Sequence, residues 1–180
     1  MTVETNPSDC GIWNKEGSCL IPLALMETLP LYHRETIPTD YLDIMGHMNI
    51  RWYFDLFAKS GRKFFASYGL DDDYFRGGKF GVFTLKQFIQ YFAEVHVGQT
   101  VAIHTRLIGR SEKRFQFMHF MINETTSRLA STFEALITHA DLKLRLAAPM
   151  PAQIAQKFDA TLSKDETLDW EAPVCGVMRL

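Results

Sequence analysis

The amphipathic segment 50–68 constrains the fold of this chain more than any other feature. Its apolar and small residues recur at intervals of three and four, which places them on one face of an α-helix; they are Ile50, Tyr53, Phe54, Phe57, Gly61, Phe64, Phe65 and Tyr68. Asn49 is of a type that caps helix N-termini, and Gly69 suits the position just past a helix end. The broad apolar stripe predicts a long helix that the rest of the chain largely covers.

Alternating β-like stretches surround this helix in the sequence. Residues 31–39 precede it and end near Pro38, and four more stretches follow it, at about 80–96, 100–110, 114–124 and 130–146. The breaks between these four are short and carry turn residues, so we expect each stretch to pair with the next in an antiparallel meander. The prediction is an α+β fold with one long central helix wrapped by a curved antiparallel β-sheet. Its exposed edge favours pairing with a second copy.

One domain accounts for most of the 180 residues. We expect it at 31–151, between an N-terminal arm at 1–30 and a C-terminal helix and tail at 152–180. The net charge of −2 gives no reason to expect nucleic acid or an anionic membrane as partner. No apolar run reaches the ~20 residues that a membrane-spanning helix needs. Cys10, Cys19 and Cys175 form neither a disulfide framework nor a zinc pattern, and without a signal-peptide pattern we expect a cytoplasmic protein.

The densest cluster of reactive side chains lies in residues 40–49, immediately before the predicted helix. Asp43 is close enough in sequence for its carboxylate to approach the helix N-terminus, where the first backbone N–H groups have no intrahelical partner. Such N–H groups can polarise a carbonyl oxygen, while a carboxylate can attack a carbonyl carbon or activate water. Gly46 allows the loop backbone to come close to a substrate. This combination suits attack on a carbonyl group.

The order of residues around this loop resembles a known family. An Asp three residues before a Gly, a following His-x-Asn, and a Tyr seven residues after the Gly read here as Asp43, Gly46, His47, Asn49 and Tyr53. This pattern is similar to that of hotdog-fold acyl-CoA thioesterases of the 4-hydroxybenzoyl-CoA thioesterase type. The resemblance extends over 32–151 and includes the long helix and the strand order. It implies the hotdog fold.

The resemblance also implies roles for individual residues. Asp43 matches the family's catalytic Asp, and the backbone N–H of Ile50 matches its carbonyl-polarising donor, while His47 and Asn49 shape the loop or position water. Candidate substrate-binding residues are Gly46, Tyr53, Thr84 and Arg114. The implied substrate is an acyl-CoA or acyl-carrier thioester, with no metal or organic cofactor. The implied assembly is a homodimer or homotetramer with sites shared between subunits.

Simpler interpretations stand beside these roles. Asp43 can serve as a turn residue, Asn49 as an N-cap and His47 as a solvated loop residue, while Tyr53 falls on the buried stripe and suits the core. The sequence also departs from the family pattern in two places. Gly61 stands where many relatives have an acidic residue followed by Arg, and Ile50 replaces a second Asn.

Three alternatives remain open at this level, one of them another type of thioesterase site and two of them other functions. A related type of site, with the acid inside the helix, would use Asp55. A hotdog enoyl-CoA hydratase would need an Asp-x-Asn-Pro-x-x-His pattern, which the segment from Asp43 to His47 lacks. The third alternative is a non-catalytic acyl-CoA-binding hotdog protein.

Two further clusters carry weaker signals. The strand histidines His96, His104, His119 and His139 lack the spacing of metal ligands, so ordinary buried histidines are favoured over a metal site. The basic residues Arg106, Arg110, Lys113 and Arg114 gather near one predicted hairpin. They suit either CoA phosphates or a solvated hairpin, and the sequence favours neither.

Overall fold

The computed structural model describes residues 21–180. Its elements, in chain order, are α1 (Leu23–Glu27), β1 (Leu31–Thr36), a 3₁₀ turn (Thr39–Tyr41), α2 (Ile50–Ser67), α3 (Asp72–Arg76), β2 (Phe80–Tyr91), β3 (Thr100–Arg110), β4 (Arg114–Asn123), β5 (Arg128–Asp141), β6 (Leu146–Ala147) and α4 (Ala152–Asp165). Most of the expected arm, with Cys10 and Cys19, lies outside the described residues, and the proposed domain boundaries stay a prediction. Within 21–180, no helix is both long and apolar enough to span a membrane.

The long helix α2 begins and ends where its capping residues predict. The Asn49 side chain accepts a hydrogen bond from the Arg51 N–H, which satisfies one of the free donors of the first turn. At the other end Gly69 has a φ of +92°, and the N–H groups of Gly69 and Leu70 donate to carbonyls of the last turn. This is a Schellman arrangement, which glycine adopts without strain. Local sequence signals alone therefore define both ends of α2.

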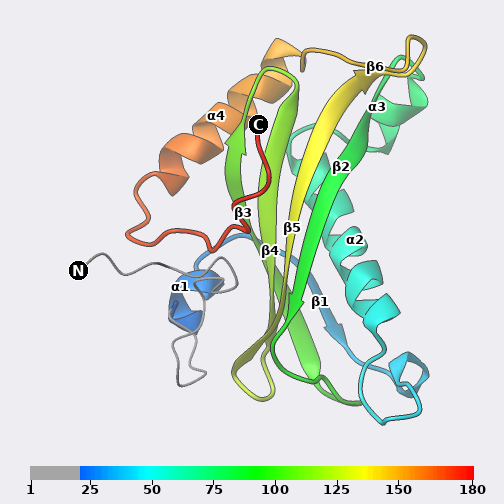
Figure 1. Cartoon of the computed structure of the whole chain (residues 1–180), viewed down its shortest axis with the longest axis vertical. Helices are drawn as coiled ribbons and strands as arrows, with labels where there is room; N and C mark the ends of the chain where they lie inside the picture. The colour runs from blue at the N-terminus through cyan, green and yellow to red at the C-terminus, as the bar shows by residue number, and fades with distance from the viewer. Residues whose placement is uncertain (1–20) are drawn as a thin grey trace.

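The sheet is antiparallel, with the strand order β1-β3-β4-β5-β2 and β6 beside β5, and it curves around α2 (Figure 1). The expected α+β arrangement is confirmed, but the four-strand meander is wrong. Strands β3, β4 and β5 do follow one another, whereas β2 pairs along its whole length with β5 and forms the opposite edge from β1. The strand predicted at 80–96 ends at Tyr91, and the irregular residues 92–99 connect β2 to β3, from which β5 and β4 separate it in the sheet.

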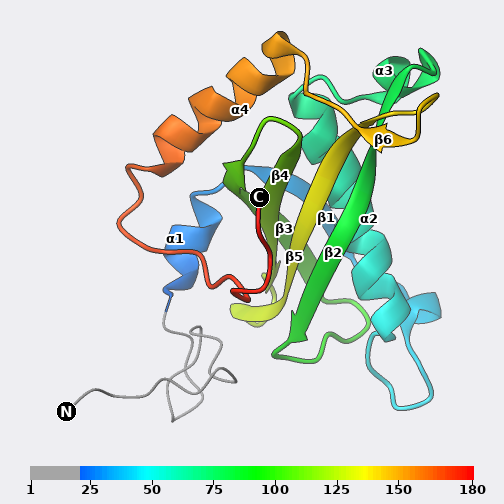
Figure 2. The ribbon, with the colours of Figure 1, turned by 45° about the horizontal axis from the view of Figure 1, so that its top comes forward.

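Alternation along the central strands gives the sheet two buried faces. On β4, Phe115, Phe117 and Met121 pack against α2, and Met118 and Phe120 point to the opposite face. That opposite face is covered by α1 and by the segment after α4, which runs across the sheet to the C-terminus (Figure 2). Buried faces on both sides explain why the central strands carry large apolar residues on both faces.

Two connecting segments differ from the sequence-based expectation. The turn-rich connection after α2 contains the short helix α3, whose N-cap Asp71 accepts a hydrogen bond from the Tyr74 N–H at 2.9 Å. The strand predicted at 130–146 ends at Asp141, because that side chain accepts hydrogen bonds from the N–H groups of Lys143 and Leu144 and forms a turn. The C-terminal helix is present as α4 and begins at the predicted residue, Ala152.

Candidate active site

The loop before α2 folds into a small hairpin with Asp43 at its base. Leu42 and Met48 form an isolated antiparallel bridge, and the Asp43 N–H donates to the His47 carbonyl at 2.9 Å. The Gly46 N–H closes the turn by donating to the Asp43 carbonyl at 3.0 Å, with Gly46 at a φ of +85°. A side chain would strain that conformation, so the glycine is required by the turn. The hairpin places Asp43 and His47 side by side.

The two carboxylate oxygens of Asp43 have different surroundings. Oδ1 accepts a hydrogen bond from the Met45 N–H at 2.9 Å, which is the local turn contact that the simpler interpretation expects. Oδ2 lies 3.4 Å from Nδ1 of His47, and the side chains of Asp43 and His47 are 15% and 24% exposed. One oxygen therefore stabilises the loop, and the other faces the imidazole near solvent.

The hairpin is fixed to its surroundings through backbone groups. The Asn49 N–H donates to the Tyr41 carbonyl at 2.9 Å, and the Met48 N–H donates to the Val95 carbonyl at 2.7 Å. The ring of His96 also contacts the Gly46 carbonyl, with 3.1 Å between Nδ1 and the oxygen. Residues 92–99 thus support the hairpin through Val95 and His96.

A cleft of about 260 Å³ opens beside this hairpin at the N-terminus of α2. It is lined by His47, Met48, Ile50, Tyr53, Tyr91, Phe92, Ala93 and Glu94. Ile50 is the first residue of α2, so its N–H has no intrahelical acceptor, and within residues 21–180 no other acceptor contacts it. The cleft therefore combines an available helix N-terminal donor with the His47 that contacts the Asp43 carboxylate.

Tyr53 is a wall of the cleft and is held in place. Its ring meets that of Tyr91 edge to face, with the centroids 5.1 Å apart, and its hydroxyl donates to the Ala93 carbonyl at 3.3 Å. Burial raises the pKa of Tyr53 to about 12, so this hydroxyl stays protonated at neutral pH. Tyr53 packs in the core, as its place on the apolar stripe predicts, and also borders the cleft.

A second hollow of about 330 Å³ lies between α2 and the strands β2 and β5. Aromatic rings form much of its wall, among them Phe54, Phe57, Phe65, Phe75, Phe117 and Phe133. Thr84 lines this aromatic cavity and not the cleft at the helix N-terminus, and Gly61 also borders it. Phe54 lies one helical turn beyond Ile50, so the aromatic cavity starts close to the cleft.

Arg114 is far from the cleft within one subunit. It pairs with Thr138 of β5, which in turn pairs with Phe83 of β2. The cleft residue Tyr91 lies eight positions further along β2, about 26 Å at the usual rise per strand residue. Two other basic residues of this hairpin have partners: Arg110 binds Asp159 of α4 at 2.5 and 2.6 Å. Arg106 donates to the Trp170 carbonyl.

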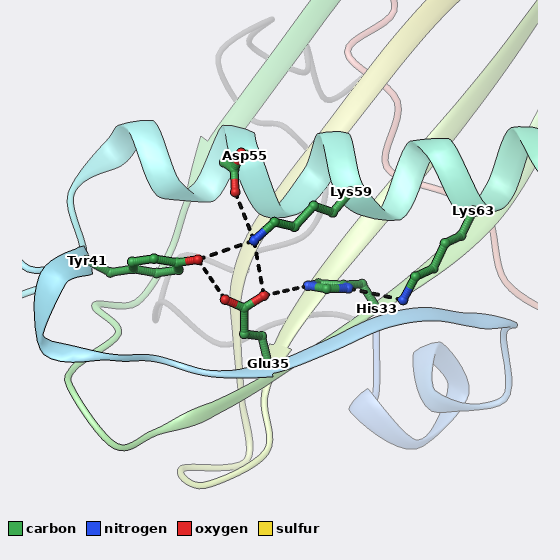
Figure 3. Close-up of polar contacts among 6 residues, drawn as sticks. All are labelled: His33, Glu35, Tyr41, Asp55, Lys59 and Lys63. Carbon is green, nitrogen blue, oxygen red and sulfur yellow. Dashed lines mark hydrogen bonds and ion pairs between the residues drawn. The ribbon is translucent and has the colours of Figure 1, made fainter. Parts of the chain in front are cut away.

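The remaining candidates are also engaged elsewhere. Asp55 forms an ion pair with Lys59 at 3.1 Å on the side of α2 that faces β1, away from both hollows (Figure 3). The four histidines have separate partners: the Gly46 carbonyl for His96, the Leu29 carbonyl for His104, Thr105 for His119, and Tyr74 with the Ala148 carbonyl for His139. His96 lies in the irregular residues 92–99 and not on a strand as predicted. In the part of the chain that the structure describes, no three metal-ligating side chains come together.

The contribution of residues 91–96 to the site is not visible in the sequence. Tyr91 and Glu94 line the cleft, and His96 supports the hairpin, although some 40 to 50 residues separate them from the loop. No spacing rule connects such distant segments. A sequence signal that could have been used is the irregular composition after Tyr91, which ends the strand and marks a segment with another role.

Comparison with known proteins places this arrangement in a family. The family model of the thioesterase-like superfamily matches residues 37–158. An L-carnitine dehydrogenase/betainyl-CoA thioesterase of Agrobacterium fabrum is 28% identical over 134 residues, which cover 74% of this chain and 27% of that protein. The chain thus spans less than a third of this longer relative. A betainyl-CoA thioesterase of Pseudomonas aeruginosa is 23% identical over 76% of this chain and 85% of its own length.

Solved structures show the same fold. A Staphylococcus aureus protein in complex with CoA superposes with a TM-score of 0.75 at 20% identity, over 84% of this chain and 96% of that one. The likeness extends over nearly all of the other chain, so the curved sheet around a central helix is the same architecture in both. The expected fold is confirmed.

Proposed function

The chain belongs to the thioesterase-like superfamily, with its hotdog fold, and we propose that it hydrolyses the thioester bond of an acyl-CoA in the cleft at the N-terminus of α2. One observation carries the proposal: Ile50, the first residue of α2, and His47, which contacts Asp43, line the same cleft. Hydrolysis needs a group that attacks the carbonyl or activates water, and a donor for the oxygen that becomes negative. The loop and the helix supply one each.

In the simplest mechanism Asp43 acts as a general base. It takes a proton from a water molecule whose oxygen adds to the thioester carbon, while the Ile50 N–H donates to the developing oxyanion. Collapse of the tetrahedral intermediate breaks the carbon–sulfur bond, and the leaving thiolate recovers the proton from Asp43. Direct attack by Asp43 is the alternative form, in which water hydrolyses an anhydride. A single turnover in ¹⁸O-labelled water separates the two, because only the second can leave label in the Asp43 carboxyl.

The acyl group that we propose is small and cationic. The relatives named betainyl-CoA thioesterases suggest a trimethylammonium group, and the cleft supports this with the ring of Tyr91 and the carboxylate of Glu94. Aromatic faces and a nearby carboxylate attract quaternary ammonium groups. The aromatic cavity beyond Phe54 favours a longer apolar acyl group instead. The substrate test therefore includes both classes.

The active assembly that we propose is a homodimer or larger oligomer built on β2. This edge strand is twelve residues long and exposes Leu85, Phe88 and Tyr91. An unpaired edge with exposed apolar side chains favours pairing with another copy. Since Tyr91 also lines the cleft, a partner strand along β2 would lie beside the reacting groups.

Release of free thiol from purified protein tests the proposal. Betainyl-CoA is compared with 3,3-dimethylbutanoyl-CoA, which has the same shape without the charge, and with octanoyl-CoA. We expect thiol release with the highest kcat/KM for betainyl-CoA. A preference for the neutral isostere would contradict the cationic acyl group but not the hydrolysis. Binding of all three thioesters without thiol release would contradict hydrolysis and support the non-catalytic alternative.

A further inference from the structure

We propose that Tyr41, Glu35 and Lys59 are positioning residues, which hold the Asp43 hairpin in register with the N-terminus of α2 from the side of the helix opposite to the cleft. The inference rests on the proposed function, because it concerns the relative placement of Asp43 and the Ile50 N–H. None of the three residues lines the cleft. They act through the backbone of the hairpin.

Tyr41 connects the hairpin to the first turn of α2. It stands two residues before Asp43, and its carbonyl accepts the hydrogen bond from the Asn49 N–H at the N-cap. Its ring stacks on Trp52 of α2, with the centroids 3.8 Å apart and the planes within 8° of parallel. A movement of the Tyr41 ring therefore shifts the chain that leads to Asp43 relative to the start of α2.

The hydroxyl of Tyr41 is held by two charged side chains from different elements (Figure 3). It donates to Oε1 of Glu35 on β1 at 2.7 Å, and it accepts from Nζ of Lys59 on α2 at 3.2 Å. Lys59 also contacts Oε2 of Glu35 at 3.3 Å and Asp55 at 3.1 Å. The hydroxyl is thereby fixed from both the strand and the helix, and hydrogen bonds to charged groups are the stronger ones.

The charge of this cluster is balanced at neutral pH. On the far side of Glu35, Nε2 of His33 lies 2.8 Å from Oε2, and Nδ1 of His33 lies 3.3 Å from Nζ of Lys63. Burial raises the pKa of Glu35, but the hydrogen bonds from Tyr41, His33 and Lys59 outweigh it and hold the pKa below its usual value. Two lysines and the carboxylates of Glu35 and Asp55 then cancel.

Stability alone does not account for so many contacts around one hydroxyl. The Lys59 side chain is 40% exposed, and ion pairs of this kind contribute little to the free energy of unfolding. Placement of the hairpin is a stricter requirement, because a displacement of about 1 Å at a reacting group can lower a rate by up to ~100-fold. The cluster includes Tyr41, only two residues before Asp43, so a displacement of its ring would be passed directly to the hairpin.

The chain provides a matched control at the other end of the same strand and helix. The hydroxyl of Tyr32 on β1 bonds to Oγ of Ser67 at 3.2 Å, in the last turn of α2. Tyr32→Phe and Tyr41→Phe thus remove the same group from the same β1–α2 junction, one far from the hairpin and one beside it. Only the second should change the placement of Asp43.

The test measures kcat and KM for thiol release in Tyr41→Phe, Glu35→Gln and Tyr32→Phe. For Tyr41→Phe we expect kcat to fall about tenfold, which is the effect of one hydrogen bond to a charged group, with little change in KM. In Glu35→Gln we expect kcat to fall by a similar factor. The double variant Tyr41→Phe with Glu35→Gln should have a kcat no lower than that of the slower single variant, because the two residues act as one unit. Wild-type kcat in Tyr41→Phe, or an equal loss in Tyr32→Phe, would overturn the proposal.

Amide hydrogen exchange gives a second readout that needs no activity. Tyr41→Phe should speed exchange at the Asn49 and Gly46 N–H groups of the hairpin and leave the Leu70 N–H at the far end of α2 unchanged. If the wild-type protein releases no thiol but the exchange pattern changes in this way, the proposed function fails and the positioning role holds. Unchanged exchange in the hairpin overturns the positioning role in either case.

Discussion

The two flanks of α2 are built in opposite ways. Toward β1 the helix presents Lys59, which forms ion pairs with Glu35 and Asp55 and donates a hydrogen bond to the Tyr41 hydroxyl. Toward β2 it presents Ile50 and Phe54, with 65% and 44% of their surface exposed, above the cleft and the aromatic cavity. One flank is closed by specific polar contacts and the other is open and apolar.

The two flanks therefore differ in role: one holds the helix in place, and the other can bind a substrate or a second subunit. The polar flank has directional contacts that set where the helix N-terminus lies relative to the hairpin. The apolar flank has exposed surface that a substrate or a second subunit can cover, and burial of such surface is the main driving force for both. Substitutions on the two flanks should therefore have different signatures, and the predictions below follow that division from the largest effect to the smallest.

The largest effect is expected at the junction of the two flanks. Asp43→Asn should lower kcat for thioester hydrolysis by at least ~10²–10⁴-fold, because an amide neither attacks a carbonyl nor takes a proton from water. The thermal midpoint should hardly change, since the amide oxygen can still accept the Met45 N–H bond. A folded Asp43→Asn variant with wild-type turnover would show that Asp43 is only a turn residue.

The next effect compares the two edge strands directly. Leu85 on β2 is 45% exposed and Leu31 on β1 is 41% exposed, so Leu85→Glu and Leu31→Glu are the same change on opposite edges. A glutamate buried without a partner at an interface costs about 3–5 kcal/mol, which weakens association by at least ~100-fold. Light scattering should then show a smaller mass for Leu85→Glu only. Loss of the oligomer in Leu31→Glu as well would contradict assembly through β2.

Where the sequence predicted the structure well, the signals were local. Asn49 and Gly69 define both ends of α2, and the alternation along β4 separates the two faces of the sheet. The sequence also predicted a loop containing Asp43 and Gly46 directly before the helix, although the hairpin that this loop forms is seen only in the structure. These features depend on residues that are near one another in the chain.

The features that escaped prediction depend on distant pairing. The sequence around Phe80–Tyr91 identifies a strand but not its partner, and pairing with β5 instead of β3 requires residues 92–99 to cross from one side of the sheet to the other. The same path brings Glu94 to the cleft and His96 to the Asp43 hairpin. Likewise, Glu35 and Lys59 are 24 positions apart, and no helix or strand periodicity connects a β1 carboxylate with a lysine on α2.

The third prediction concerns the core between the two flanks. His119 is fully buried under α2, and burial lowers its pKa to about 3. In the unfolded chain His119 binds a proton with a pKa near 6.5, whereas in the folded protein it stays neutral until the pH approaches 3. The free energy of unfolding should therefore fall as pH drops from 6.5 toward 3, by up to ~1.4 kcal/mol per pH unit. His119→Phe should have a lower free energy of unfolding at pH 7, because the Thr105 hydroxyl loses its partner. That free energy should also change less with pH than in the wild-type protein. Urea titrations at pH 7 and 4.5 measure the stability of both proteins and its change with pH. If the change between the two pH values is the same in His119→Phe as in the wild-type protein, the assignment to His119 is contradicted.

The smallest effect tests whether Gly61, which borders the aromatic cavity on the open flank, lowers the free energy of unfolding. Gly61 lies inside α2, where glycine is about 1 kcal/mol less favourable than alanine. An added Cβ would lie 3.6 Å from Nε2 of His119, an ordinary contact, so packing does not demand glycine there. Gly61→Ala should therefore raise the free energy of unfolding by roughly 0.5–1 kcal/mol in urea titrations. Because Gly61 borders the aromatic cavity, the methyl group should raise KM for octanoyl-CoA and leave KM for betainyl-CoA unchanged if the small acyl group stays in the cleft. A more stable variant with equally raised KM values would show instead that every acyl group extends along the β2-facing flank of the helix.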